Sequence, residues 1–186
     1  MQAGPVVPAP TARLTFARPT MADVAEIFHA YASDPEVTKY LVWPTHQSPD
    51  NTRTFVTFSD HEWARWPSGP LLIRRHDTGR LIGGTGLAFA DETHASTGYV
   101  FARVAWGQGF ATEALHAMVG LAERCGVREL EAGCHPDHFA SQRVLEKCGF
   151  TPDPASVGLA EFPNLVVGLP QPVLRFVRPL PSSPSA

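Results

Sequence analysis

Apolar and polar positions repeat with two different periods along this chain, and together they predict a domain that mixes helices with strands. Helical spacing is clearest over residues 111–125, where apolar residues return at offsets 0, 3, 4, 7, 11 and 14. Thr20 and, further on, Ser48 or Asp50 are typical residues for opening two earlier helices. A shorter helical stripe follows at Ala140, Val144, Leu145 and Cys148.

Short apolar or alternating runs predict the strands. They lie at residues 13–17, 71–74, 81–87, 97–104, 129–134 and 173–177, with one more starting at Phe150. The resulting order is strand, two helices, three meandering strands, helix, strand, helix and two strands. This order predicts an α+β fold with a mixed sheet. It disfavours a doubly wound fold, in which strands and helices alternate strictly.

Length and charge bound the class of protein. The 186 residues suit one domain, which we place at 12–179 between two proline-rich tails, 1–11 and 180–186, that we expect to be disordered. A net charge of −3 gives no indication of a nucleic-acid partner or an anionic membrane surface. No run approaches the roughly 18 apolar residues of a membrane span, and the first residues lack a signal-peptide pattern. Three cysteines without CxxC spacing are typical of reduced thiols, so we expect a cytoplasmic protein.

The run from Trp106 to Ala114, Trp-Gly-Gln-Gly-Phe-Ala-Thr-Glu-Ala, carries the strongest chemical signal in the chain. Its two glycines and first alanine leave a turn nearly free of side chains, directly before the long predicted helix. The N–H groups of a helix's first turn have no partner inside the helix, so they attract anions. The run therefore predicts a phosphate-bearing ligand, unless its glycines only make a tight turn from strand to helix.

Known phosphate loops narrow this interpretation. A P-loop would end in Gly-Lys-Ser/Thr, which is absent here. A dinucleotide fingerprint would have a third glycine at Thr112, although Glu129 or Glu131 could supply its acidic partner. The loop also resembles the acyl-CoA loop of the GNAT acetyltransferases, Gln/Arg-x-x-Gly-x-Gly/Ala, which often begins with Trp in one branch. The positions of that pattern are held here by Trp106, Gly109 and Ala111.

A second motif lies downstream of the loop. The segment from His138 to Phe150, His-Phe-Ala-Ser-Gln-Arg-Val-Leu-Glu-Lys-Cys-Gly-Phe, closely resembles the Asn-x-x-Ser-x-x-Val-Leu-Glu-Lys-x-Gly-Phe segment of RimJ/RimL-type GNAT proteins. Two motifs in the family's order, on a matching order of elements, are far more specific than either alone. The resemblance covers residues 13–150 well and the last strand loosely.

The resemblance implies a GNAT fold, in which a mixed central sheet with flanking helices splays into a V that takes the pantetheine arm of acetyl-CoA. It implies acetyl-CoA as the acetyl donor. The acceptor would be a primary amine, either the α-amine of a protein such as a ribosomal subunit or a small molecule. A homodimer is common in the family, and the sequence leaves the oligomeric state open.

The resemblance also assigns residues to the donor. The strand from Phe101 to Val104 would pair with the pantetheine amides, and a backbone N–H near Arg103 would stabilise the oxyanion. Ser141 would donate a hydrogen bond or a proton to the departing thiolate, and Arg143 would contact a CoA phosphate or remain a solvated charge. Backbone amides would bind the pyrophosphate at Gly107, Gln108, Gly109, Phe110, Ala111 and Thr112.

The chain departs from the family pattern at two positions. The family's Asn is His138 here, which could replace the contact of the Asn, act as a base, or cap the helix, and which we keep beside Ser141 as a catalytic candidate. The family's frequent Glu before the Gly-Tyr pair is also missing, because Ser96 and Thr97 stand there. Asp137 is the expected N-cap of the short helix. Candidate replacements for the carboxylate base are His135, Asp137, His138 and Glu92.

Aromatic residues in the first third of the chain are candidates for the acceptor pocket. Trp43 and His46 would face the acceptor, and Tyr99 could polarise it or pack in the core. Three aromatic residues of the second helix are expected to face inward: Phe55, Phe58 and Trp63. We expect no metal site, because the run of Cys and His at 134–138 has no second cluster of ligands.

Two other functions stay open from the sequence. The missing strand carboxylate and the replaced Asn would also suit a non-catalytic acyl-CoA-binding or partner-binding module on the same fold. A nucleotide-binding oxidoreductase would rest on Gly107, Gly109 and Glu129.

Overall fold

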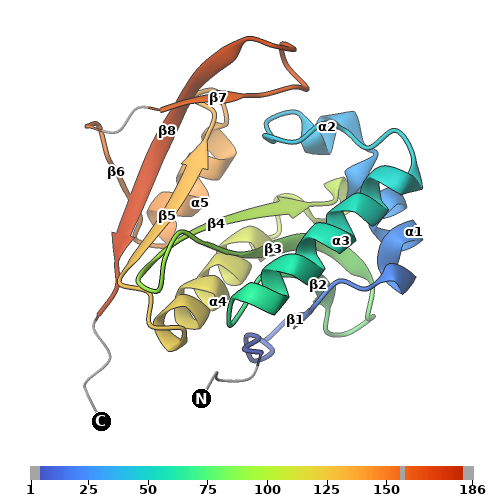
Figure 1. Cartoon of the computed structure of the whole chain (residues 1–186), viewed down its shortest axis with the longest axis horizontal. Helices are drawn as coiled ribbons and strands as arrows, with labels where there is room; N and C mark the ends of the chain where they lie inside the picture. Colours follow the sequence, from blue (N-terminus) through green and yellow to red (C-terminus); the bar gives the residue numbers. More distant parts are fainter. Residues whose placement is uncertain (1–4, 156–157, 182–186) are drawn as a thin grey trace.

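The computed structural model describes residues 5–155 and 158–181, and within them eight strands form one mixed sheet (Figure 1). Along the sheet the strands lie in the order β1-β2-β3-β4-β5-β8-β6, and β7 pairs with β8. This arrangement confirms the predicted α+β fold. The strands are β1 Leu14–Ala17, β2 Pro70–Arg75, β3 Leu81–Phe89, β4 His94–Phe101, β5 Glu129–Cys134, β6 Thr151–Pro152, β7 Gly158–Glu161 and β8 Pro170–Pro179.

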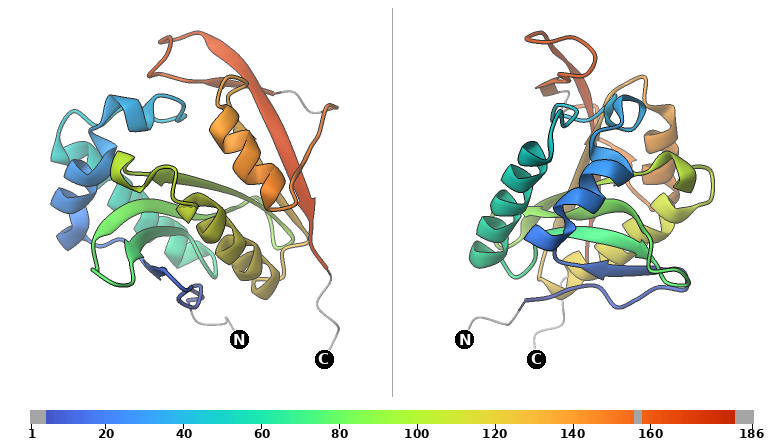
Figure 2. Two further views of the ribbon diagram at one scale, coloured as in Figure 1. Left: turned by 180° about the vertical axis from the view of Figure 1, so that it is seen from behind. Right: turned by 90° about the vertical axis from the view of Figure 1, so that its right-hand side faces the viewer.

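Helices cover both faces of the sheet (Figure 2). One face carries α4 (Phe110–Arg124) and α5 (Phe139–Lys147). The other carries α1 (Val24–Ile27), α2 (Pro35–Thr38) and α3 (Pro49–Arg65). α1 follows a short 3-10 turn at Met21–Asp23 and runs into one π-helical turn at Phe28–Ala32. The apolar stripe of α4 is buried against β3 and β4, and the buried side chains of α1 and α3, among them Ile27, Val56 and Trp63, pack against β2 and β3.

β4 and β5 separate part-way along their length. They are parallel neighbours, and their ladder consists of the pairs His94–Glu129, Ala95–Leu130 and Ser96–Glu131. Beyond Ser96, β4 continues beside β3 to Phe101, while β5 continues beside β8 to Cys134. The two halves of the sheet therefore diverge from Ser96, which confirms the splayed V that the family resemblance implied.

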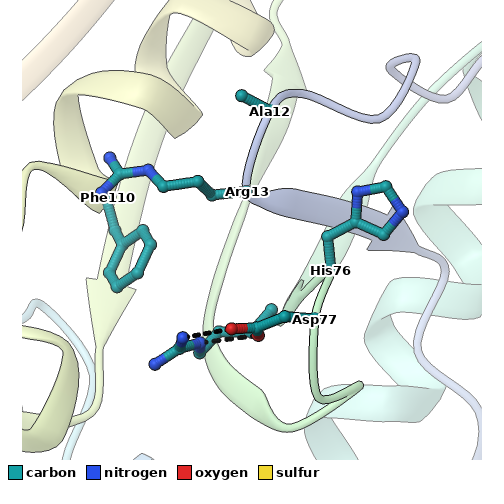
Figure 3. Close-up of a pocket in the computed structure, with 6 residues that line it drawn as sticks. Ala12, Arg13, His76, Asp77 and Phe110 are labelled. Carbon is teal, nitrogen blue, oxygen red and sulfur yellow. Dashed lines mark hydrogen bonds and ion pairs between the residues drawn. The ribbon is translucent and has the colours of Figure 1, made fainter.

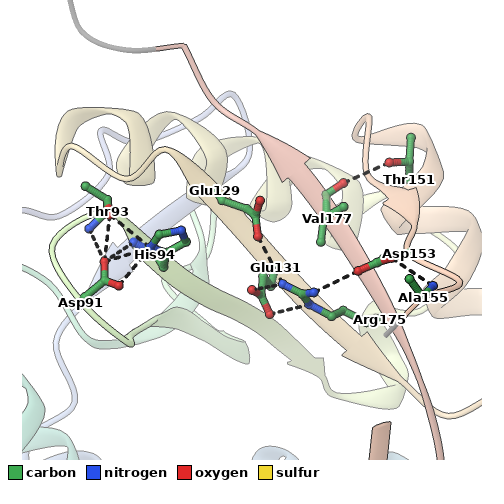
Figure 4. Close-up of polar contacts among 10 residues, drawn as sticks. All are labelled: Asp91, Thr93, His94, Glu129, Glu131, Thr151, Asp153, Ala155, Arg175 and Val177. Atoms are coloured by element: carbon green, nitrogen blue, oxygen red, sulfur yellow. Dashed lines mark hydrogen bonds and ion pairs between the residues drawn. The ribbon is translucent and has the colours of Figure 1, made fainter. Parts of the chain in front are cut away.

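An ion cluster holds the strands together where the V begins (Figure 4). Arg175 on β8 donates through Nε to Glu131 Oε2 at 2.9 Å, and its other nitrogens reach Glu129 at 3.2 Å and Asp153 at 2.9 Å. Glu131 is also the last residue of the β4–β5 ladder. One guanidinium thus ties β5 to β8 and to the segment after β6 at the point from which the strands part.

The sequence placed the end of β4 wrongly. We expected this strand over 97–104, but it runs from His94 to Phe101 and is followed by a 3-10 turn at Arg103–Ala105. The indole of Trp106 donates to the Phe101 carbonyl at 2.7 Å, which turns the chain out of the sheet. The short strand β7 was not predicted either.

Parts of the two expected tails have defined contacts. The Val6 N–H donates to the Pro67 carbonyl at 2.7 Å, and Arg124 donates to the Val7 carbonyl at 3.2 Å. Near the other end of the chain, the Leu180 N–H donates to the Arg128 backbone carbonyl at 2.8 Å, and the Leu180 side chain is buried. The rest of the expected tails, 1–4 and 182–186, lies outside the described residues. No helix of the described chain is long and apolar enough to cross a membrane.

Candidate active site

The glycine loop before α4 presents its amides outward. Gly107 and Gly109 have φ of 72° and 78°, in the left-handed region that favours glycine. The first helical hydrogen bond runs from the Glu113 N–H to the Gly109 carbonyl at 3.1 Å. Across the described residues, no group accepts a hydrogen bond from the N–H groups of residues 107–112. Six amides at and just before the N-terminus of α4 therefore have no partner among the described residues, which leaves them available to an anion.

Side chains brace this loop from behind without capping its amides. Arg13 donates to the Gln108 carbonyl at 2.9 Å and to the Glu113 carboxylate at 2.6 Å. Thr11 donates to the same carboxylate at 2.6 Å. The Phe110 ring is buried, with the Arg13 guanidinium 4.4 Å from its centroid, so only the backbone of Phe110 is available to a ligand.

A smaller cavity of about 440 Å³ adjoins the loop at this point (Figure 3). Arg13 and Arg75 line it, and both are ion-paired, Arg13 with Glu113 and Arg75 with Asp77. The complete lining is Ala12, Arg13, Arg75, His76, Asp77 and Phe110. This cavity meets the start of α4 at Phe110, and its two guanidinium groups are already neutralised by carboxylates.

A larger cavity of about 620 Å³ occupies the opening between β4 and β5. Its walls include residues 96–100 of β4 and residues 132–134 of β5. The Ala102 N–H bonds to Ile82 of β3 at 2.8 Å, so by the alternation of an antiparallel pair Tyr99 and Phe101 turn their peptide groups toward the opening. The Phe101 carbonyl is already taken by Trp106. The remaining groups can pair with an amide-bearing arm.

Ser141 and Tyr99 meet inside this cavity. Ser141 lies on the first turn of α5 and Tyr99 on β4, and their hydroxyl oxygens are 2.9 Å apart. Ser141 is buried at 9% exposure, and both residues line the cavity. Burial raises the pKa of Tyr99, so the phenol stays protonated at neutral pH. The two residues come from separate motifs, and the sequence predicted each of them but not their pairing.

His138 also lines the cavity, with its ring stacked on Tyr40 at a centroid distance of 4.8 Å. Burial, and to a lesser degree the nearby His135, lowers the pKa of His138, which favours the neutral imidazole. His138 occupies the N-cap position of α5, but its side chain makes no capping hydrogen bond. The expectation that Asp137 would be this N-cap was wrong. Its side chain is 72% exposed.

The other candidate bases lie away from the cavity lining. His135 is buried, with Nδ1 accepting from the Asp137 N–H at 3.1 Å and Nε2 3.1 Å from the Gln171 side chain. Glu92 stands in the turn between β3 and β4, at the opposite end of β4 from the glycine loop. The sequence named four candidate bases. Among the described residues that line the large cavity, His138 is the only one of these four.

The acceptor candidates lie together on the α3 side of the V. Trp43 and His46 line the large cavity, and their rings are 5.1 Å apart. Burial lowers the pKa of His46, whose Nδ1 is 2.9 Å from the Thr52 hydroxyl. The prediction that Trp63 faces inward is confirmed, since it is buried and bonds to the Pro70 carbonyl. The prediction for Phe58 was wrong, because this ring is 53% exposed and lines the cavity.

Asn164 lies behind the cavity lining and holds the loop of Trp43, and sequence reasoning missed it. Its amide nitrogen donates to the carbonyls of Thr38 at 2.7 Å and Trp43 at 2.9 Å. Its amide oxygen accepts from the Thr45 N–H at 2.8 Å and the Thr45 hydroxyl at 3.0 Å. These four bonds fix the loop that carries Trp43 to the segment between β7 and β8.

Three residues that the sequence assigned to binding acetyl-CoA have side chains at the surface. Arg103 uses its side chain to bond Asp34 at 2.7 Å, which ties the end of β4 to the N-cap of α2. Val104 is 57% exposed, and its carbonyl accepts from the Gln108 side chain at 2.7 Å. Arg143 is exposed on α5. Within the described part of the chain, no group of three or more His, Cys, Asp or Glu side chains is placed to hold a metal ion.

Comparisons with known proteins agree with this geometry. A model of the acetyltransferase (GNAT) domain matches residues 13–151, so the chain belongs to the GNAT acetyltransferase family. The chain is 27% identical over 143 residues to the protein called uncharacterized N-acetyltransferase p20 of Bacillus licheniformis. That match covers 75% of this chain and 80% of the relative.

Two solved structures share the fold. One is an acetyl transferase from Salmonella typhimurium that modifies the N-terminal serine of a 50S ribosomal subunit protein. It has a TM-score of 0.75 and 18% identity, and the match covers 92% of this chain and 97% of that one. The other is the spermidine N-acetyltransferase of Vibrio cholerae, in complex with CoA and spermine. It has a TM-score of 0.75 and 17% identity, and the match covers 91% of this chain and 96% of that one.

Proposed function

We propose that this protein takes the acetyl group from acetyl-CoA and transfers it directly to a primary amine. The observation that carries the proposal is the set of unpartnered N–H groups at 107–112, joined through β4 to the cavity that holds Ser141 and Tyr99. The amides would bind the pyrophosphate, and Arg13 stands beside them. The pantetheine would lie along β4 in the opening, paired with the peptide groups of Tyr99 and Phe101.

In the transfer, the amine nitrogen attacks the thioester carbonyl, a C–N bond forms and the C–S bond breaks. Ser141 would donate its hydroxyl hydrogen to the departing sulfur, and Tyr99, held protonated by burial, would donate to Ser141 in turn. The backbone N–H of Arg103, which bonds to no described acceptor, would stabilise the oxyanion.

The nitrogen must also lose a proton. His138 lines the same cavity and is favoured in its neutral form, so we assign it as the acceptor of that proton. Solvent then restores both side chains, and the products are an amide and free CoA. Holding the two substrates in one cavity supplies much of the rate gain.

The test combines calorimetry with turnover. Purified protein is titrated with CoA and then incubated with acetyl-CoA and a panel of amines, while thiol release and the mass of the acetylated product are followed. Amine-dependent thiol release with a matching acetylated product would support the proposal. CoA binding with no release for peptides, polyamines or small amines would contradict it, and would instead favour a non-catalytic CoA-binding module.

A further inference from the structure

The large cavity has an uncharged lining. Among the described residues, no Asp, Glu, Lys or Arg lines it. Its histidines, His46 and His138, are both favoured as neutral imidazoles because burial lowers the pKa of each. The Cys134 thiol, whose pKa burial raises to about 11, is protonated at neutral pH. A ligand in this cavity therefore meets no formal charge from the lining side chains.

Three carboxylates at or near α1 and α2, next to the acceptor side, are paired with guanidinium groups. Asp34, next to the loop that carries Trp43, accepts from Arg103 at 2.7 Å. Glu26 on α1 accepts from Arg74 at 2.7 Å, and the same guanidinium also bonds Asp23 at 2.9 Å. Recognition of a polycation requires unpaired negative charge near its ammonium groups, and none of these three carboxylates offers it.

Aromatic and aliphatic side chains supply the acceptor side of this cavity. Trp43, Phe55 and Phe58 line it from α3 and the preceding loop, and Tyr40 lines it beside His138. Phe58 is 53% exposed, and Val42, which also lines the cavity, is 61% exposed. Exposed apolar groups at the edge of a cavity mark the place where an apolar ligand removes them from water.

The cavity is of a size for a small molecule. Its volume of about 620 Å³ falls within the range of roughly 300–1,000 Å³ typical of small-ligand sites, and it must also hold the end of the pantetheine arm. The four hydrogen bonds of Asn164 hold its wall at the loop of Trp43. The remaining space is of the order that a small organic amine needs.

From these observations we infer that the acceptor is a primary amine carried on a small aromatic or branched aliphatic body, such as an arylalkylamine. This inference rests on the proposed transfer to an amine and names its substrate class. An uncharged, apolar pocket also disfavours the ammonium form of the amine, so desolvation assists the deprotonation for which no strand carboxylate is present.

The experiment compares kcat/KM for 2-phenylethylamine and isoamylamine with that for spermidine and for a peptide with an N-terminal serine, all with acetyl-CoA. We expect the two apolar amines to exceed spermidine and the peptide by about tenfold or more. Phe58→Glu places a carboxylate at the exposed edge of the cavity, where it should not disturb folding. This variant should lower the ratio of kcat/KM for 2-phenylethylamine to kcat/KM for spermidine by about tenfold.

Phe139→Glu is the matched control, because Phe139 is an exposed phenylalanine on α5, 62% exposed, that does not line the cavity. In Phe139→Glu the ratio of kcat/KM for 2-phenylethylamine to that for spermidine should equal the ratio of the unmodified protein. Preference for spermidine or the peptide, or equal effects of the two Glu variants, would overturn the inference while leaving acetyl transfer intact. A preference for hexanoyl-CoA over acetyl-CoA that Phe58→Glu abolishes would also overturn it, since the cavity would then hold the acyl chain. No transfer to any amine would refute the proposed function itself.

Discussion

The pairing of Tyr99 with Ser141 makes a quantitative prediction. Tyr99→Phe removes one hydroxyl and keeps the ring that lines the cavity. The lost hydrogen bond, 2.9 Å between the two oxygens, has a net value of about 1 kcal/mol, which for a chain of this size lowers Tm by about 2–4 °C. A general acid contributes about 10²–10⁴-fold to a rate, and Ser141 keeps its own hydroxyl in this variant. We therefore expect kcat to fall by about a hundredfold, near the lower limit.

The assay is thiol release at saturating acetyl-CoA for Tyr99→Phe, Ser141→Ala and the double variant. Because the two hydroxyls act in series, the double variant should be no slower than Ser141→Ala. CoA affinity should change little in all three. Ser68→Ala is the control, since it removes a fully buried hydroxyl that lies away from the cavity lining. Additive losses in the double variant, or an unchanged kcat in Tyr99→Phe, would refute the relay.

Three further predictions concern the glycine loop before α4, the protonation of His138 and the hydrogen bonds of Asn164. Gly109→Ala forces a side chain into left-handed backbone, at a cost of about 1–2 kcal/mol, and should weaken CoA binding about tenfold by calorimetry. Gly126→Ala, with φ of 82° at the other end of α4, should match its loss of stability and leave CoA binding unchanged. Burial lowers the folded-state pKa of His138 below 6.5, so the unfolded chain binds the proton first as pH falls, and the free energy of unfolding decreases below about pH 6.5. Urea titrations at several pH values should show a smaller decrease in His138→Asn, and an identical pH profile would contradict the assignment. Asn164→Ala removes four hydrogen bonds and should lower the free energy of unfolding by about 2–3 kcal/mol. It should also raise the KM for the acceptor more than the dissociation constant for CoA. Equal changes in these two constants would show a merely structural role.

Features that depend on neighbouring residues could be predicted from the sequence. The glycine turn before α4, the helix that follows it and the placement of Ser141 on the first turn of α5 all follow from short motifs. The bounds of β5 matched the expected run, because polar and apolar residues alternate over its length as they do in a strand with one buried face.

Features that depend on distant contacts could not. The mostly apolar run over residues 98–104 is typical of a buried strand, yet the Trp106 indole bonds to the Phe101 carbonyl and the strand ends there. Tyr99 and Ser141 are 42 residues apart, and Asn164 lies 119 residues from Thr45. No periodicity signals such pairs. Phe58 was expected in the core because an aromatic residue at helical spacing does not reveal whether its face meets packed side chains or an open cavity.

The parting of β4 from β5 has a mechanical consequence. An amide-bearing arm laid against β4 would extend the contact between two half-sheets whose direct strand pairing, in the described chain, ends at Ser96 and Glu131. Occupancy would then stiffen the whole molecule as well as fill a site. Asn164 and the Tyr99–Ser141 pair already join the two halves, so the donor would add a further link across the space into which the second substrate must fit.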